Sequence, residues 1–465
     1  MEISTILEKQ RQYFLSGETL DYKFRINQLN KLLDSINTNS TELLAAFKAD
    51  LNKCEYDAVS TEIGLVIKEI KYLRSHLRGL MRPHRATTSI INFPSSGKIV
   101  REPFGQVLIM SPWNYPFQLA ICPLAGAIAG GNTAVVKPSA YTPTVSAVIA
   151  KILAIFAPEY IACVQGGREQ NQELLNQKFD FIFFTGSKAV GEIVEEKASK
   201  NLCPVVLELG GKSPCIVDET ANIKKAAQRI VWGKFLNAGQ TCIAPDYILV
   251  QDSIYDKFIT EVIDVTKEFY YDGDKLKDDF MYIVNEKHAN RLKNLIIPEK
   301  VVFGGKLNNR LLEPTIMRDV SYDDAVMQEE IFGPIMPIIK YSDISEVIDY
   351  INSHDKPLAL YYFTKNKKLA NLVISRTSSG GVCLNEVVMH FTEHNLPFGG
   401  VGASGMGNYH GKHSFFTFTH AKCVLKKSAN LELNLKYPPC TTQKTKITYM
   451  YLGYKKPKNK QEKDQ

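Results

Sequence analysis

The sequence predicts an α/β protein built around parallel sheets. Between residues 106 and 217, short apolar runs bounded by turn residues alternate with stretches whose apolar residues recur at helical spacing. A second alternation of the same kind follows between residues 247 and 363. Buried strands that alternate with helices are typical of doubly wound α/β domains. We therefore expect two Rossmann-like α/β domains.

The elements of the first half follow from local patterning. Residues 1 to about 80 are expected to be helical, because apolar residues such as Leu29, Leu33 and Ile36 recur at helical spacing. Near Gly97 the pattern changes to short strand-like runs, for example Lys98–Arg101. The strands expected in the first sheet are Gln106–Met110, Thr133–Lys137, Phe181–Phe184 and Val205–Leu209, with helices at Val145–Phe156 and Ala189–Lys197 between them.

The second alternation provides candidate strands at Tyr247–Val250, Ile335–Ile339 and Leu358–Phe363. Pro337 is unusual in the middle one, because proline cannot donate to a strand ladder. The longest apolar stretch, Phe117–Gly131, is shorter than the roughly 20 residues that a membrane span needs, and Pro123 interrupts it. We expect it to be a buried helix of the core.

The composition is that of an ordinary globular protein. Of the 465 residues, 45% are hydrophobic and 23% are charged, which excludes disordered, collagen-like and small disulfide-stapled proteins. The net charge of +7 is too small to argue for a polyanionic partner. Much of it lies in the segment 444–465, where seven lysines stand against Glu462 and Asp464. We therefore expect no nucleic acid to bind.

The tail from residue 441 onward is polar and rich in lysine, so it is expected to be poorly ordered. A weak peripheral membrane contact through Ile447–Tyr454 and the lysines stays open as an alternative. The nine cysteines form an odd, scattered set, which favours a reducing compartment over a disulfide framework. Since the N-terminal residues show no secretory signal pattern, we expect a cytoplasmic location.

Two residues are candidates for covalent catalysis. Cys242 stands in Gly239-Gln240-Thr241-Cys242, and Glu208 ends an apolar run before Gly210-Gly211. The carboxyl end of a strand is where open α/β sheets place their ligands. A thiol with a pKa of about 8.5 is only partly ionised at neutral pH, so it needs a nearby base or an electropositive site. Taken singly, the cysteine could be a small buried side chain and the glutamate a strand-end cap.

Seven segments resemble the aldehyde dehydrogenase superfamily, and they occur in family order. The segments are Ser111-Pro112-Trp113-Asn114-Tyr115-Pro116, Lys137-Pro138-Ser139, Phe184-Thr185-Gly186-Ser187, Leu207-Glu208-Leu209-Gly210-Gly211-Lys212-Ser213-Pro214, Gly239-Gln240-Thr241-Cys242, Glu329-Glu330-Ile331-Phe332-Gly333-Pro334 and Pro397-Phe398-Gly399-Gly400. The short N-terminus and the run from Tyr409 to Phe415 resemble the class 3 branch, which includes the fatty aldehyde dehydrogenases. The resemblance implies NAD(P)-dependent oxidation of medium-chain or long-chain aliphatic, or aromatic, aldehydes to carboxylic acids.

The resemblance also implies catalytic roles at the matching positions. Cys242 would attack the aldehyde carbon and form a thiohemiacetal, while Asn114 and the backbone N–H of Cys242 would stabilise the oxyanion. Hydride transfer to the nicotinamide would leave a thioester, and Glu208 would activate the water that hydrolyses it. The alternative for Asn114 is a turn residue ahead of Tyr115-Pro116.

NAD or NADP is the cofactor that the resemblance implies. In place of a G-x-G-x-x-G fingerprint, the expected pyrophosphate site is Gly186-Ser187-Lys188-Ala189-Val190-Gly191, which follows a strand and opens a helix. By resemblance, Lys137 contacts the adenosine ribose, Glu330 holds the nicotinamide ribose, and Phe332 packs near that ring. The remaining residues expected at the cofactor are Ser111, Pro112, Trp113, Ser139 and Leu209.

The sequence departs from the class 3 pattern at Ala140, where members commonly have Glu after Lys-Pro-Ser. A carboxylate there binds ribose hydroxyls and repels a 2′-phosphate. We therefore expect NADP to be used at least as readily as by relatives with Glu. No metal site is expected, because His410 and His413 lack further candidate ligands.

By resemblance, residues 1–83 and 103–208 would form the NAD(P)-binding domain and 209–398 the catalytic domain. Residues 84–102 and 405–440 would form a bridging and oligomerisation region of a homodimer, followed by the basic tail 441–465. One alternative is a CoA-acylating relative, which often lacks the base that Glu208 provides. The other is a catalytically silent binding protein of the same fold. Because Cys242, Glu208 and Asn114 are all present, we expect an active enzyme.

Overall fold

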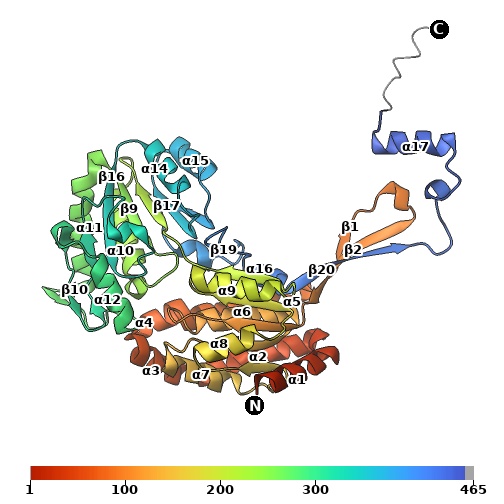
Figure 1. The fold of residues 1–465 in the computed structure, drawn as a ribbon, viewed down its shortest axis with the longest axis horizontal. Coiled ribbons are helices and arrows are strands. Elements are labelled where there is room, and N and C mark those ends of the chain that lie inside the picture. Colours follow the sequence, from red (N-terminus) through yellow and green to blue (C-terminus); the bar gives the residue numbers. More distant parts are fainter. Residues whose placement is uncertain (1, 456–465) are drawn as a thin grey trace, which may run out of the picture. The chain divides into compact units, whose positions relative to one another are not determined.

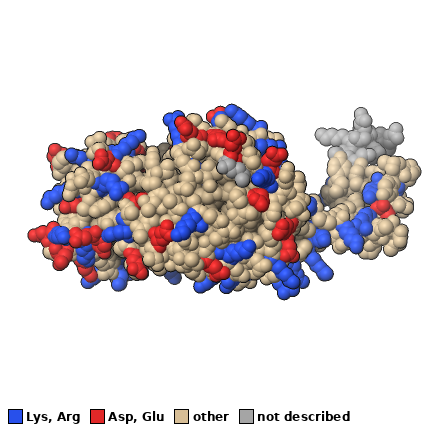
Figure 2. Space-filling view, turned by 90° about the horizontal axis from the view of Figure 1, so that it is seen from below, with Lys and Arg blue, Asp and Glu red and all other residues tan. Residues whose placement is uncertain are grey.

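The computed structural model describes residues 2–455 and divides the chain into two compact units. Residues 2–80 and Glu102–His420 form the first unit, and Met81–Arg101 with residues 421–455 form the second. Figure 1 shows both units with their helices and strands. On the face shown in Figure 2, basic and acidic side chains are interspersed. Within the described residues, no helix is both long and apolar enough to cross a bilayer.

The first unit contains a six-stranded sheet in the order β19-β7-β6-β3-β4-β5. Its strands are β3 (Gln106–Met110), β4 (Thr133–Lys137), β5 (Ile161–Cys163), β6 (Phe181–Thr185), β7 (Val205–Glu208) and β19 (Gly405–Met406). All pairs are parallel except β19 with β7. The four predicted strands are confirmed. From β3 the chain moves to β4 and β5 on one side and then to β6 and β7 on the other, so a topological switch point lies between β3 and β6.

One face of this sheet is covered by α1 (Ile3–Leu15), α8 (Arg168–Leu175) and α9 (Lys188–Ser199). Side chains alternate along a strand, so Leu108 and Met110 of β3 point to the same face. They join one buried cluster with Leu7, Leu174 and Val194, which come from the three helices in turn. The helices therefore lie over the sheet because their apolar stripes match its apolar face.

Further helices pack around α6 (Gln118–Gly130), which is buried along its whole length. It contacts α2 (Tyr22–Thr38), α5 (Gly64–Leu80) and α16 (Lys412–Thr417). It also contacts η2 (Val59–Ile63), the short helical segment that directly precedes α5. The expected core helix at Phe117–Gly131 is thus confirmed, and so are helices through residues 1–80. The remaining elements of this region are α3 (Ser40–Leu51), α4 (Glu55–Ala58) and α7 (Pro143–Leu153).

A second, seven-stranded sheet in the first unit has the order β12-β15-β16-β9-β8-β17-β18. The strands are β8 (Pro214–Val217), β9 (Tyr247–Gln251), β12 (Val301–Phe303), β15 (Thr315–Met317), β16 (Ile335–Tyr341), β17 (Ala359–Phe363) and β18 (Gly381–Leu384). Pro337 lies one residue before the pairing of β16 with β9 begins at Ile338, so its missing N–H leaves that ladder intact. The predicted fold class, α/β with two parallel sheets, is confirmed.

Helices cover both faces of the second sheet (Figure 1). One pair is α10 (Ile223–Phe235) with α11 (Tyr255–Tyr270), and the other is α14 (Ile344–Asn352) with α15 (Lys367–Arg376). Each pair carries apolar residues at helical spacing, for example Phe258, Val262 and Val265 on α11, all of which are buried. The arrangement leaves the carboxyl ends of the parallel strands and their following loops to build a site.

The second unit contains a three-stranded sheet of β1 (His84–Ala86), β2 (Ser95–Pro103) and β20 (Thr419–Lys427), in the order β1-β2-β20. The predicted strand Lys98–Arg101 lies within β2 and is confirmed. The predicted bridging region 405–440 differs from the observed boundary, because residues 405–420 belong to the first unit. Gly405 pairs with Glu208 across β19 and β7, and Phe415 of α16 is fully buried there.

The tail also differs from the expectation of an unstructured segment, because residues Thr442–Leu452 form helix α17. The Thr441 side chain accepts a hydrogen bond from the Lys444 N–H, and Gly453 ends the helix in the left-handed region at φ 64°. Threonine is a favoured residue at a helix N-cap, and glycine is a favoured residue at the C-terminal end of a helix. The rest of the predicted tail, 456–465, lies outside the described residues.

A buried ion pair ties the N-terminal helices to α6. Lys53 Nζ lies 2.6 Å from Glu62 Oε1, and both side chains are 0% exposed. The second oxygen of Glu62 accepts the backbone N–H groups of Phe117 and Gln118, each at 3.0 Å. These N–H groups open α6 and have no partner within the helix. The lysine nitrogen also lies 4.6 Å from the centre of the Tyr115 ring.

We expect Lys53→Ala to lower the free energy of unfolding by about 3–5 kcal/mol, because it leaves the Glu62 carboxylate buried without its counter-ion. Chemical denaturation of the wild-type protein and of the Lys53→Ala variant would measure this loss of unfolding free energy. Lys151→Ala is the matched control, since Lys151 pairs with Glu42 on the surface and such pairs contribute at most about 1 kcal/mol. Equal losses in the two variants would contradict a stabilising role for the buried pair.

Candidate active site

Cys242 lies in the loop that joins η4 (Leu236–Gly239) to β9. Gly239 has φ +72°, and a Cβ at this position would come within 2.2 Å of the Gly333 carbonyl oxygen. Only glycine fits such a contact in the left-handed region. The glycine of the Gly-Gln-Thr-Cys segment is therefore required by the loop that presents the thiol.

Three hydrogen bonds hold the residues on both sides of Cys242. They run from Asn114 Nδ2 to the Gln240 carbonyl (2.9 Å), between the Tyr115 and Thr241 hydroxyls (2.6 Å), and from the Tyr361 hydroxyl to the Ile243 carbonyl (2.6 Å). Asn237 adds a return bond from its Nδ2 to the Asn114 carbonyl at 3.0 Å. The partners come from both sheets of the first unit, so the thiol has one fixed position between them. The predicted residues Asn114 and Cys242 are thus brought together.

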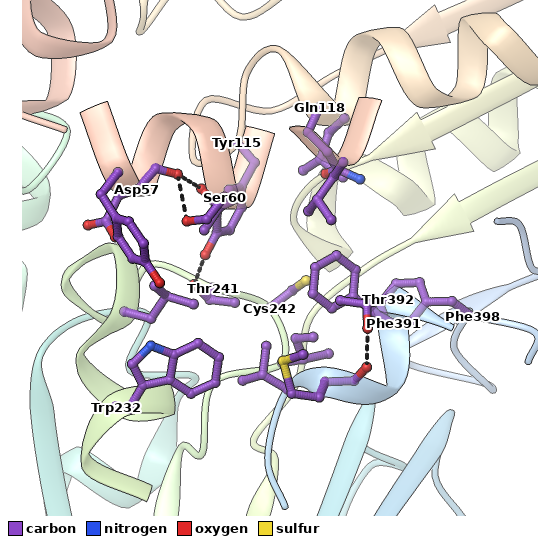
Figure 3. Close-up of a pocket in the computed structure, with 18 of the residues that line it drawn as sticks. Asp57, Ser60, Tyr115, Gln118, Trp232, Thr241, Cys242, Phe391, Thr392 and Phe398 are labelled. Atoms are coloured by element: carbon purple, nitrogen blue, oxygen red, sulfur yellow. Dashed lines mark hydrogen bonds between the residues drawn. The ribbon is translucent and has the colours of Figure 1, made fainter. Parts of the chain in front are cut away.

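The thiol faces an apolar cavity of about 250 Å³. Its aromatic and aliphatic lining includes Tyr56, Leu65, Tyr115, Leu119, Trp232, Leu236, Ile243, Val388, Met389, Phe391, Phe398 and Tyr409. Figure 3 shows Cys242 among these side chains, with Thr241 bonded to Tyr115 beside it. Among the described residues that line the cavity, Asp57 alone is acidic or basic. The cavity therefore suits an uncharged apolar ligand whose reacting group reaches the sulfur.

Glu208 ends β7 as predicted, and its side chain is buried. Neither of its carboxylate oxygens has a hydrogen-bond partner in the described part of the chain. Burial raises the pKa of Glu208 well above its ordinary value. A buried carboxyl without partners costs free energy, so such a group is usually retained for a ligand or for chemistry.

Glu330 lies against Gly210, where a Cβ would come within 2.3 Å of a carboxylate oxygen. Burial, and then the nearby charge of Asp246, raise the pKa of Glu330 to about 8. Lys212 and Asp246 fix the segment that carries it. Lys212 donates to the Glu329 carbonyl at 2.8 Å, and Asp246 accepts the N–H of Ile331 at 2.9 Å. The carboxylate of Glu330 is therefore held at the edge of the site by its own backbone.

The carboxyl groups of Glu330 and Glu208 affect the ionisation of the Cys242 thiol. Burial raises the pKa of its thiol to about 12, and the charges of Glu330 and then Glu208 add to the effect. The backbone N–H groups of Cys242 and Ile243 act in the opposite direction, because they stabilise a thiolate. The thiol is therefore protonated at neutral pH in this state of the protein, and it needs a base before it can react.

Two grooves contain predicted cofactor residues, and the first lies at the carboxyl ends of β3, β4 and β6. The first groove, of about 560 Å³, contains five of the predicted cofactor residues: Ser111, Trp113, Lys137, Ser139 and Val190. The second groove, of about 510 Å³, contains three more: Ser187, Lys188 and Glu330. The structure thus places most of the predicted cofactor residues in these two grooves.

The other predicted cofactor residues support these grooves without lining them. Gly186 belongs to the turn into α9, Ala189 belongs to the first turn of that helix, and Pro112 stands between two lining residues. A Cβ on Gly191 would lie 2.7 Å from the Leu209 side chain, so this glycine permits α9 to approach the sheet. The Phe332 ring meets the Trp113 ring edge-on, with 5.4 Å between centroids.

The residues present fit a dinucleotide. Ser111 Oγ, Asn171 Oδ1 and Thr185 Oγ1 are buried polar atoms without a partner among the described residues. The N-cap Ser187 makes no side-chain bond to α9, so the N–H groups that open this helix are open to an anion. Unpaired polar atoms and free helix N–H groups are what ribose hydroxyls and a pyrophosphate require. No group of three or more ligand-type side chains that could hold a metal occurs within residues 2–455.

Sequence reasoning missed most of the cavity lining and part of the first groove. Phe391 and Met389 stand on a short helical turn after β18, and Trp232 stands inside α10. Nothing in their local sequence marks a site, because they reach it only through the tertiary fold. Tyr115 could have been found, since it directly follows Asn114 in one of the seven segments that resemble the family.

We expect Glu330→Gln to lower the pKa of the Cys242 thiol, because a neutral amide removes a negative charge that opposes the thiolate. The rate of alkylation by iodoacetamide should rise by about three- to tenfold at about pH 9 and above, where the Glu330 carboxyl, with its pKa of about 8, is ionised in the wild-type protein, and peptide mass spectrometry across a pH series would measure it. Glu329→Gln is the matched control, since Glu329 is exposed and paired with Arg291. An unchanged alkylation profile for Glu330→Gln would show that the charge of Glu330 does not reach the thiol.

Comparisons with known proteins identify the family. The family model described as "Aldehyde dehydrogenase family" matches residues 1–424. The 4,4'-diaponeurosporen-aldehyde dehydrogenase of Staphylococcus aureus is 46% identical over 96% of this chain and 97% of its own length. Rat aldehyde dehydrogenase family 3 member A2 is 45% identical, with 96% and 93% covered, and a dog enzyme named "Aldehyde dehydrogenase, dimeric NADP-preferring" is 42% identical, with 96% and 99% covered.

A solved structure, the substrate-bound state of Staphylococcus aureus AldH, superposes with a TM-score of 0.94 at 45% identity. The match covers 98% of this chain and 100% of that one. The relative named as a family 3 member supports the predicted class 3 branch. The chain therefore belongs to the aldehyde dehydrogenase family, and the predicted class of enzyme, an oxidoreductase that oxidises aldehydes with NAD or NADP, is confirmed.

Proposed function

We propose that the apolar cavity receives a hydrophobic aldehyde and that Cys242 attacks its carbonyl carbon. The observation that carries this proposal is a single cysteine thiol at the cavity wall, with an unpartnered carboxyl group, Glu208, close enough to affect its ionisation. Attack by the sulfur forms a thiohemiacetal and places negative charge on the former aldehyde oxygen. Removal of the thiol proton must come first, because burial holds the thiol neutral.

Asn114 and the backbone N–H of Cys242 supply hydrogen bonds to that oxygen. Asn114 Nδ2 already donates one N–H to the Gln240 carbonyl, which orients the amide and leaves its second N–H available. Donors fixed before the reaction stabilise developing charge at no reorganisation cost, and removing one such donor typically costs about 3–4 kcal/mol. The nicotinamide of NAD or NADP, when bound, accepts the hydride from the carbon attached to Cys242.

Glu208 then removes a proton from the water that hydrolyses the thioester on Cys242. A carboxylate with a raised pKa is a stronger base than one in water, and its raised pKa lies closer to the operating pH. Hydrolysis releases the carboxylic acid and restores the thiol. The residues that would hold the cofactor are those of the two grooves, with Lys137 and Ser139 in the first and Ser187 and Glu330 in the second.

The preferred substrates are medium-chain or long-chain aliphatic, or aromatic, aldehydes. The lining is mostly aromatic and aliphatic, and the only acidic or basic side chain among the described lining residues is Asp57. An aldehyde that carries its own carboxylate would meet this negative group and no positive one. The Staphylococcus aureus relative is named for the aldehyde of a diaponeurosporene, and this name agrees with a hydrophobic substrate.

NADP serves at least as readily as it does in relatives with Glu after Lys-Pro-Ser. Ala140 lines the first groove beside Lys137 and Ser139, so no carboxylate from this position opposes a 2′-phosphate. The dog relative named as NADP-preferring is 42% identical to this chain.

The chain acts as a homodimer in the cytoplasm. Its second unit contains most of strand β20, which stands at the edge of a three-stranded sheet and exposes Leu425. An edge strand with an apolar residue can pair with another chain, and the dog relative is named as dimeric.

All nine cysteines are free, as expected in a reducing compartment. Helix α17 and Tyr454 expose apolar and aromatic side chains next to Lys444 and Lys446, which suits a weak peripheral contact with an anionic membrane.

Two substitutions test the assigned roles. Cys242→Ala should lower turnover by about a thousandfold or more, while NADPH binding measured by fluorescence stays intact. Glu208→Gln should slow deacylation, so an acyl group accumulates on Cys242 and appears as added mass in the intact protein. Cys423→Ala is the control, because Cys423 is exposed on β20 and stands outside the first unit. Full turnover by Cys242→Ala would refute the mechanism.

A panel of aldehydes, run with both cofactors, tests the substrate class. Each methylene that enters the cavity should raise kcat/KM by about three- to fourfold, because burial of a CH₂ is worth about 0.8 kcal/mol. The rise should stop when the cavity is full, and an aldehyde with a terminal carboxylate should react poorly. A flat response to chain length would exclude the hydrophobic assignment, and a preference of about a hundredfold for NAD would exclude the NADP assignment.

A further inference from the structure

The first groove has an unusual charge balance. Its lining contains two cationic side chains, Lys137 and Arg168, and no aspartate or glutamate among the described residues. The other groove and the cavity each contain at least one carboxylate, such as Glu330 and Asp57. A groove lined by one sign of charge concentrates ligands of the opposite sign. This part of the site therefore suits an anionic group beyond the pyrophosphate that α9 would hold.

Arg168 is free to bind such a group. It is the first residue of α8, it is exposed, and its guanidinium makes no hydrogen bond or ion pair within the described residues. Other arginines in the first unit are paired, for example Arg229 with Glu386 and Arg291 with Glu329. An arginine that lines a groove without a carboxylate partner keeps its whole fork of donors for a ligand.

A second observation in the same groove also indicates a ligand. Asn171 follows Arg168 by one helical turn and lines the groove, and its Oδ1 is buried without a hydrogen-bond partner in the described chain. Residues three apart on a helix lie on one face. Lys137 is 3% exposed, and its Nζ donates one hydrogen bond to the Pro138 carbonyl at 2.9 Å. Two N–H donors of its ammonium group are left for a ligand. The lining thus offers cationic donors and an acceptor, as an adenosine ribose with a phosphate on its 2′-oxygen requires.

We propose that Arg168 binds the 2′-phosphate of NADP and is the residue that supports the use of NADP by this enzyme. The assignment rests on the proposed use of NADP and adds the group that recognises it. Planar guanidinium groups match phosphate oxygens in a bidentate geometry, which a lysine cannot reproduce. Ala140 favours NADP because no carboxylate at this position repels the 2′-phosphate, whereas Arg168 attracts the 2′-phosphate. The two effects can therefore be tested separately.

Binding of nucleotide fragments tests the assignment without catalysis. Isothermal titration of the full-length protein with 2′,5′-ADP and with 5′-AMP isolates the contribution of the 2′-phosphate. Wild-type protein should bind 2′,5′-ADP more tightly. Arg168→Gln should weaken 2′,5′-ADP by about five- to twentyfold, the range for a charged hydrogen bond at an exposed site, and change 5′-AMP by less than about twofold. Arg168→Lys should recover part of the loss, and about 0.5 M NaCl should reduce the wild-type difference.

Lys200→Gln is the matched control, because it removes one positive charge from the exposed end of α9 outside the groove. It should leave both affinities at wild-type values, and thermal unfolding should show that Arg168→Gln is folded. If Arg168→Gln keeps the wild-type ratio of the two affinities, the role of Arg168 is refuted while NADP use stands. If wild-type protein binds 5′-AMP at least as tightly as 2′,5′-ADP, the proposed use of NADP fails, and the role of Arg168 fails with it.

Discussion

The hydrogen bond from the Asn114 side chain to the Gln240 carbonyl is the interaction on which the site depends. It joins the loop after β3, in the first sheet, to the loop before β9, in the second. Asn237 donates back to the Asn114 carbonyl, so each loop satisfies a polar group of the other. Because an unpaired buried polar group costs about 1–3 kcal/mol, the reciprocal pairs fix one arrangement of the loops. Cys242 follows Gln240 by two residues and takes its position from this tie.

The burial that fixes the loops also works against ionisation. Burial is the largest cause of the raised pKa values of Cys242, Glu208 and Glu330. A thiolate beside two ionised carboxylates would be strongly disfavoured in a medium of low dielectric constant. The fold therefore keeps the nucleophile in its unreactive, protonated form until a base removes the proton. The same effect raises the basicity of Glu208, so one physical cause sets both the resting state and the strength of the base.

Local sequence was sufficient wherever a local pattern determines the structure. Short apolar runs predicted the first sheet, and the placement of Glu208 at the end of β7 followed from the glycines behind it. The cavity lining could not be predicted, because Trp232 and Phe391 come from α10 and from a turn after β18, and only the packed fold brings them to Cys242. The helix α17 was missed because the lysine-rich composition outweighed two local signals, the caps Thr441 and Gly453. Local sequence also does not show that residues 405–420 lie in the first unit, because the pairing of Gly405 with Glu208 is a long-range contact.

Charge is distributed unequally along the proposed cofactor site. Carboxylates gather at the reacting end, with Glu208 and Glu330 near Cys242, while Lys137 and Arg168 stand in the first groove. The oxidised cofactor has the complementary pattern, since its nicotinamide ring is positive and its phosphates are negative. When ionised, Glu330 would attract the oxidised ring, and this attraction would end once the ring had become neutral. The contacts of Lys137 and Arg168 do not change with oxidation state. In this arrangement, the cationic groove would bind the phosphates of both forms of the cofactor equally well. The carboxylates near Cys242 would favour entry of the oxidised cofactor and release of the reduced one.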